Sequence, residues 1–242
     1  MHFHLPKPMH GWREFAGEVG IIVIGVLIAL GAEQVVETLR WHREADEAIA
    51  SIKNEVTDHY FSASEALRAT PCIDRQLEIL EAGLLQPGTY VPPPMYSDNT
   101  IEYVFRTPDR IWSDSVWRSI QAQGIVSHLP SDTRLGLGAY YSQVVGSRDN
   151  NVAIKLLDYR LRVLARPLSL DPTTKGHLVE EIEETRGRVK EQAIYASQMM
   201  RHAEALRLHP TRQTLDQMLA RSGTLKFCRD HRLPMGNDQV VL

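Results

Sequence analysis

An uninterrupted apolar run near the N-terminus constrains this chain more than any other feature of its sequence. The run extends from Val19 to Ala32 and is bracketed by Glu18 and Glu33. As a helix it rises about 21 Å, which is shorter than the hydrocarbon core of a bilayer at about 30 Å. Its length alone therefore leaves three alternatives: a membrane span, a cleaved signal peptide, or the buried helix of a soluble core.

The residues that flank the run favour a membrane span. Trp12 and Phe15 precede it, Trp41 follows it, and no proline interrupts the segment between the tryptophans. A helix from Trp12 to Trp41 is about 43 Å long, close to a bilayer with its headgroups, so these three aromatic side chains are predicted to lie at the membrane interfaces. Signal-peptide cleavage would fall near Ala29–Gly31, but the helical pattern continues through that site. We therefore expect an uncleaved transmembrane anchor over residues 15–39.

One face of the predicted anchor carries small residues. Gly25 and Ala29 lie one helical turn apart, an arrangement that lets two helix backbones approach closely. The pattern predicts that two copies of the anchor associate through one stripe of residues along the helix. The alternative is that the small residues fall together by chance and form no interface. The stripe consists of Glu18, Ile22, Gly25, Ala29, Ala32 and Val36.

Beyond the anchor, the sequence has helical patterns almost throughout. From Ala32 to Ala69 there is neither glycine nor proline, and apolar residues recur at spacings of three and four. Thr70–Pro71 has the pattern of a helix start, so a second helix, antiparallel to the first, is predicted to begin there. The proline-rich segment 86–100 predicts a surface connection. Residues 101–112 are expected to be irregular, because no partner strand is evident.

Four further helices are predicted. The first covers residues 114–123 and stops before Gly124, and the second covers residues 130–165. The third runs from Asp171–Pro172 to His209–Pro210, and the fourth covers residues 211–222. The predicted fold class is all-α, with one N-terminal transmembrane helix that continues into an antiparallel bundle of about four main helices. The predicted organisation is an N-terminal tail (1–14), a transmembrane anchor (15–39), a helical bundle (40–233) and a C-terminal tail (234–242).

Cys72 and Cys228 are the only cysteines in the chain. Two thiols are too few for a disulfide-rich scaffold or a zinc site. Because both are expected near helix ends, we predict a disulfide that joins the C-terminal segment to the bundle; two buried free thiols are the alternative. Such a bond persists in oxidising compartments and would place the bundle outside the cytoplasm. The positive charges on the two sides of the anchor are balanced and do not decide its orientation.

The sequence has no pattern typical of catalysis, cofactor binding or metal binding, so no such residue is assigned. His2, His4 and His10 are expected to belong to a flexible tail rather than to a metal site. A net charge of −3, with Lys and Arg interleaved with Asp and Glu, makes nucleic acid an unsuitable partner.

Segments 17–33 (GEVGIIVIGVLIALGAE) and 116–144 (VWRSIQAQGIVSHLPSDTRLGLGAYYSQV) together resemble an uncharacterised bacterial family, a domain of unknown function with a Gly-Glu-led N-terminal anchor. The residues that carry the resemblance are Gly17, Glu18, Trp117, Gly124, Leu129, Tyr140 and Tyr141. The resemblance implies a single-pass membrane protein with a helical body and no known activity.

These observations predict a membrane-anchored interaction or structural module, such as an accessory subunit of a membrane complex. A ligand-sensing bundle that signals through a partner protein is the alternative, and an enzyme of unrecognised type is a third. The expected partners are membrane lipid and either another protein or a second copy of the chain. The expected location is the bacterial inner membrane, crossed once, with most of the chain in the periplasm.

Overall fold

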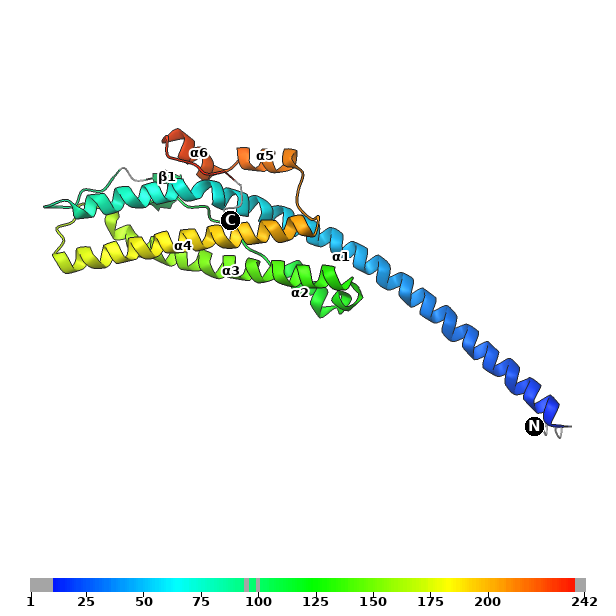
Figure 1. The fold of residues 1–242 in the computed structure, drawn as a ribbon. Helices are drawn as coiled ribbons and strands as arrows, with labels where there is room; N and C mark the ends of the chain where they lie inside the picture. The colour runs from blue at the N-terminus through cyan, green and yellow to red at the C-terminus, as the bar shows by residue number, and fades with distance from the viewer. Residues whose placement is uncertain (1–10, 94–95, 99–100, 238–242) are drawn as a thin grey trace, which may run out of the picture.

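Three long helices dominate the structure, a computed structural model that describes residues 11–93, 96–98 and 101–237 (Figure 1). They are α1 (Trp12–Leu85), α3 (Ser131–Leu161) and α4 (Pro172–Ala205). The distal half of α1 packs with α3 and α4, while its N-terminal half projects from the bundle as a stalk (Figure 1). The predicted all-α fold class is confirmed. Residues 1–10, including the three tail histidines, and residues 238–242 lie outside the described residues.

The shorter elements lie between or after the long helices, and three of the helices begin at a side-chain cap that the sequence supplies. Asp171 accepts hydrogen bonds from the first amides of α4, and Thr211 and Ser222 do the same for the two C-terminal helices. The shorter elements are β1 (Tyr96–Asp98), β2 (Ile101–Tyr103), α2 (Ser115–Ala122), the 3-10 helices η1 (Ile125–His128) and η2 (Arg162–Ala165), α5 (Arg212–Ala220) and α6 (Gly223–Asp230).

In the bundle, α1 and α3 run parallel to each other and α4 runs antiparallel to both. At the distal end, Tyr90, just after α1, pairs with Leu168, between α3 and α4. At the end near the stalk, the ring of Trp41 in α1 stacks on that of His128, just before α3. The connection between α1 and α2 therefore returns along the bundle, and α3 starts at the same end as the packed part of α1. The largest fully buried side chains include Ile52, Leu77, Leu80, Leu137, Tyr140, Leu161, Ile182 and Met199.

The predicted helix break at Thr70–Pro71 is wrong, because Pro71 lies inside α1. A proline within a helix removes one backbone hydrogen bond, here the one to the carbonyl of Leu67. The chain beyond α6 covers this point: the Gly236 amide donates to the Arg68 carbonyl at 2.9 Å, and a Cβ on Gly236 would lie only 2.9 Å from the Leu67 carbonyl oxygen. The chain around Gly236 thus packs against the turn of α1 where the hydrogen bond is missing, α1 continues through Pro71, and the described part of the bundle has three long helices.

Two other local predictions also need correction. Residues 101–103 are not irregular, because β2 pairs with β1 in a short antiparallel hairpin, whereas 104–112 have no regular structure, as expected. The helix predicted over residues 211–222 is not the last one, because α6 begins at Gly223. By contrast, α2 does stop before Gly124, whose φ of 76° lies in the left-handed region that glycine adopts most readily.

Candidate functional site

The N-terminal half of α1 is long and apolar enough to cross a membrane, and none of its most apolar stretch is buried in the protein. This finding contradicts the alternative of a buried helix in a soluble core. Trp12 is largely exposed, and its ring lies 5.9 Å from that of Phe15. Both remain candidates for the membrane interface.

The predicted self-association stripe lies on the exposed part of α1. Ile22 and Val36 are exposed, and a Cβ on Gly25 would meet no atom of the described chain within 4 Å. The other stripe residues, Glu18, Ala29 and Ala32, are exposed as well. The stripe is therefore accessible, and self-association stays a prediction.

Trp41 lies where the stalk enters the bundle. Its ring stacks on that of His128, with the centroids 3.9 Å apart and the planes 10° from parallel. The Arg40 guanidinium also lies over the Trp41 ring, 5.1 Å from the ring centroid. Trp41 is thus a packing residue of the bundle, while its predicted place at the membrane interface stays a prediction.

A groove of about 740 Å³ opens beside this stacked pair. It lies between α1, the start of α3 and the chain that follows α4. Two carboxylates, Glu37 and Asp46, and two histidines, His42 and His128, line it together with apolar side chains. The remaining lining residues are Gln34, Thr38, Trp41, Ala45, Ile49, Leu129, Pro130, Thr133, Leu206 and Leu208. Three of its lining residues, Gln34, Glu37 and Thr38, lie within the predicted anchor.

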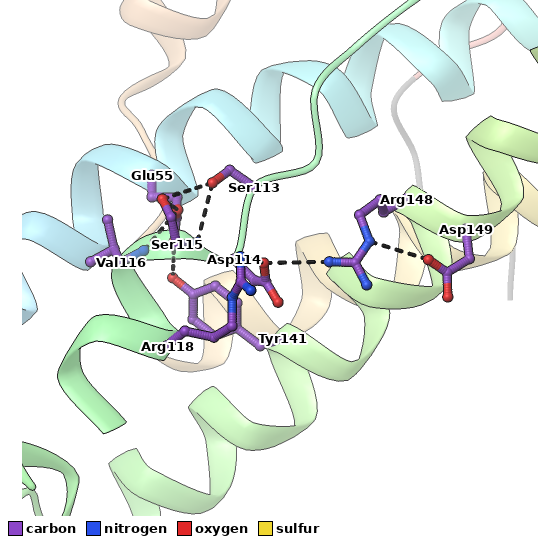
Figure 2. A network of polar contacts seen from close by, with 9 residues as sticks. All are labelled: Glu55, Ser113, Asp114, Ser115, Val116, Arg118, Tyr141, Arg148 and Asp149. Carbon is purple, nitrogen blue, oxygen red and sulfur yellow. Dashed lines mark hydrogen bonds and ion pairs between the residues drawn. The ribbon is translucent and has the colours of Figure 1, made fainter. Parts of the chain in front are cut away.

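A second polar feature joins α1 to α2 and α3 (Figure 2). Glu55 of α1 accepts a 2.6 Å hydrogen bond from the Tyr141 hydroxyl and a 3.3 Å bond from the backbone amide of Val116. That amide lies in the first turn of α2, where free N–H groups and the helix dipole favour a carboxylate. Asp114, just before α2, pairs instead with Arg118 at 3.1 Å and Arg148 at 3.4 Å. These contacts fix α2 against the two long helices.

His59 lies beside this network, one turn along α1 from Glu55. Its Nδ1 lies 3.0 Å from the hydroxyl oxygen of Tyr140, and the side chain is almost completely buried. Burial lowers the pKa of His59 and raises the pKa of Tyr140. The pKa of Tyr141 is also raised, first by burial and then by the hydrogen bond to Glu55. A neutral histidine and two neutral tyrosines therefore occupy the core, where they join α1 to α3.

The structure also contains a buried ion pair that sequence reasoning missed. Glu65 of α1 is completely buried, and both of its oxygens accept hydrogen bonds from Arg110, at 2.6 and 2.9 Å. The hydroxyl of Ser222, the cap of α6, donates to the same carboxylate. A single glutamate in a helical pattern is normally taken for a surface residue, so no local signal marked it.

Cys72 and Cys228 form the predicted disulfide, with Cα atoms 6.0 Å apart and both side chains buried. The expected position at a helix end is wrong for Cys72, which lies within α1 next to Pro71, whereas Cys228 lies in the last turn of α6. The disulfide and the hydrogen bond from Ser222 to Glu65 together attach α6 to the distal half of α1.

Among the described residues, no group of three or more His, Cys, Asp or Glu side chains is arranged to hold a metal ion. Comparisons with models of protein families, with curated proteins and with solved structures found no match. The class of protein that the fold defines is therefore an all-α bundle carried on one long, apolar N-terminal helix.

Proposed function

We propose that this chain is a single-pass membrane protein whose helical bundle serves as an interaction or structural module, such as an accessory subunit of a membrane complex. The observation that carries the proposal is the continuity of α1: one unbroken helix contains both the unburied apolar stretch and a segment that contributes to the core of the bundle. A stalk of this kind holds the bundle at a defined distance and orientation from the bilayer.

The disulfide supports a location of the bundle outside the cytoplasm, because such bonds persist in oxidising compartments. With the resemblance to a bacterial family, this gives the bacterial inner membrane as the proposed location and the periplasm as the compartment of the bundle. The proposed partners are membrane lipid and another protein or a second copy of the chain.

Three measurements on native membranes test the proposal. We expect the chain to resist carbonate extraction, to retain its N-terminal residues on sequencing, and to show two thiols that resist alkylation until reductant is added. Release by carbonate, or a mature N-terminus near Ala32, would contradict the anchor. Two freely alkylated thiols would contradict the periplasmic location alone.

The groove at the base of the bundle favours a second candidate function, a sensor of a small ligand. Its lining includes Glu37 and Asp46 but neither lysine nor arginine among the described residues, so a cationic ligand suits it best. Thermal unfolding of the chain in nanodiscs, with and without a set of organic amines, tests this function. A ligand-dependent increase in Tm that is lost in Asp46→Asn supports it, and no increase with any amine contradicts it.

A further inference from the structure

Helix α3 and the 3-10 turn that continues it present apolar side chains on two opposite faces. One face is buried in the bundle and includes Ile154 and Leu161. On the other face, four large apolar side chains remain between 42% and 62% exposed. We call this set the outer stripe; it consists of Val152, Leu156, Tyr159 and Val163.

The spacing of the outer stripe indicates what kind of element would cover it. Its members follow one another at intervals of four, three and four residues, and the three that lie in α3 are within about 60° of each other around the helix; Val163 follows in η2. Single exposed apolar residues are common on protein surfaces, but a row over three turns is a continuous apolar strip. Its intervals are those of the a and d positions of a coiled coil, a seam that packs against another helix.

Basic side chains flank the outer stripe. Lys155 lies on one side and Arg160 on the other, at the g and e positions of this heptad pattern, and Arg162 at the next g position lies over the Tyr159 ring at 4.3 Å. Each has an acidic neighbour within the chain: Asp109 at 2.6 Å, Glu181 at 3.9 Å and Asp158 at 3.0 Å, respectively.

In both arginine pairs the positive partner is the more exposed one. Arg160 is 60% exposed against 27% for Glu181, and Arg162 is 35% exposed against 12% for Asp158. The rim of the outer stripe therefore presents guanidinium groups to an approaching helix.

These charges disfavour a second copy of the chain as the occupant. In a parallel pair of α3 helices, Lys155 of one copy would face Arg160 of the other, because g positions face the e positions five residues further on. In an antiparallel pair, Lys155 would face Arg162. Both arrangements bring like charges together, whereas a helix with acidic flanks would meet complementary charges.

We propose that the outer stripe is the docking surface for an amphipathic helix of another protein, one with an apolar a/d seam flanked by Asp or Glu. The inference rests on the proposed function as an interaction module and deepens it by naming the chemistry of the partner. A helix of this kind buries the four apolar side chains and pairs its carboxylates with the basic rim.

The test uses the full chain in lipid nanodiscs and two fluorescent heptad peptides. Both peptides carry Leu at every a and d position; one has Glu and the other has Lys at every e and g position. Like charges at these positions disfavour pairing of each peptide with itself. We expect fluorescence anisotropy to show binding of the Glu peptide and at least about tenfold weaker binding of the Lys peptide, a difference that decreases as salt is added.

Substitutions assign the binding to the outer stripe. Because Leu156 and Tyr159 are exposed, the double variant Leu156→Gln/Tyr159→Gln is expected to fold and to lose binding of the Glu peptide at least about tenfold. The matched control is Ile194→Gln, which changes an equally exposed apolar residue on α4 and is expected to bind like the parent chain. An unchanged circular dichroism spectrum verifies the fold of each variant.

Several results would overturn the inference. Equal binding of the two peptides contradicts the charge argument, and full binding by the double variant contradicts the stripe. If sedimentation equilibrium shows a dimer that is lost in Leu156→Gln, the occupant of the outer stripe is a second copy of the chain and not an acidic helix of another protein. Carbonate extraction of the membranes from which the chain is purified reports on the anchor separately: a chain that membranes retain but that binds neither peptide contradicts the docking surface alone.

Discussion

The two halves of α1 belong to one helix and have opposite surroundings. Between residues 19 and 32 the apolar side chains point in every direction and remain exposed. Between residues 62 and 67, by contrast, every side chain is buried, including the polar Ser62, Ser64 and Glu65. A helix that is apolar all round needs an apolar environment from outside the chain, whereas the distal half is covered by α4 and the C-terminal segment. The contrast separates a half that lacks apolar partners within the described chain from a half whose partners the chain itself supplies.

Removal of the disulfide is expected to have the largest effect, and only on the distal half. The bond joins residues 156 positions apart, and in the chain-entropy model closing so long a loop contributes about 3–5 kcal/mol to the free energy of unfolding. We expect the double variant Cys72→Ala/Cys228→Ala to lose about this amount in urea denaturation of the chain in nanodiscs. Reductant should destabilise the parent chain equally and leave the variant unchanged. Equal stability of parent and variant would show that α6 is held without the bond.

A matched pair of substitutions compares the two halves directly. Ile52 is completely buried in the bundle, whereas Ile24 lies exposed in the apolar stretch. We expect Ile52→Ala to lower the free energy of unfolding of the bundle by about 2–5 kcal/mol, because it leaves a cavity, and Ile24→Ala to leave it unchanged. Urea denaturation followed by tryptophan fluorescence measures both. A similar loss in the two variants would mean that the N-terminal half packs against protein after all.

How far the sequence predicts each half follows from the same contrast. The stalk depends on a continuous apolar run and its aromatic flanks, which are local properties and are visible without a structure. The cap at Asp171 is equally local, and the sequence predicts a helix start there. The continuity of α1 through Pro71 depends instead on Gly236, which is far away in the sequence.

The buried polar contacts of the distal half depend on distant parts of the chain in the same way. Glu65 accepts hydrogen bonds from Arg110 and Ser222. Glu55 accepts them from Tyr141 and from the first turn of α2. No periodicity or propensity marks such residues, because their partners become neighbours only in the folded bundle. The cysteine pair is the exception, since its members were the only two of their kind in the chain.

A fall in pH is expected to lower the free energy of unfolding of the bundle through His59, which lies in the distal half of α1. Burial lowers the pKa of His59 below its ordinary value of 6.5, although Glu55, Asp58, Asp114 and the Ser113 backbone favour the charged form. The unfolded chain therefore binds a proton more readily, and the stability that this group contributes above pH 6.5 is lost as the pH falls towards its folded pKa. The expected slope is at most about 1.4 kcal/mol per pH unit.

Urea denaturation at about pH 7.5 and about pH 5.5 measures this slope. The variant His59→Gln, which cannot titrate at this position, is expected to show a smaller pH dependence than the parent chain. An equal pH dependence in the two proteins would assign the effect to other groups. The apolar stretch contains no histidine, so membrane retention should not change over this range.

The smallest expected effect concerns the stalk and its predicted self-association. Gly25→Leu places a bulky side chain on the small-residue stripe and should keep two backbones apart, whereas Gly31→Leu makes the same change about 120° away around the helix. Both glycines have open space around them in the single chain, so neither change should disturb the bundle. We expect crosslinking in membranes to show about fivefold less dimer for Gly25→Leu, or about 1 kcal/mol, and parent-like dimer for Gly31→Leu. Equal crosslinking of both variants would exclude the stripe as an interface, and lipid alone would then cover the N-terminal half of α1.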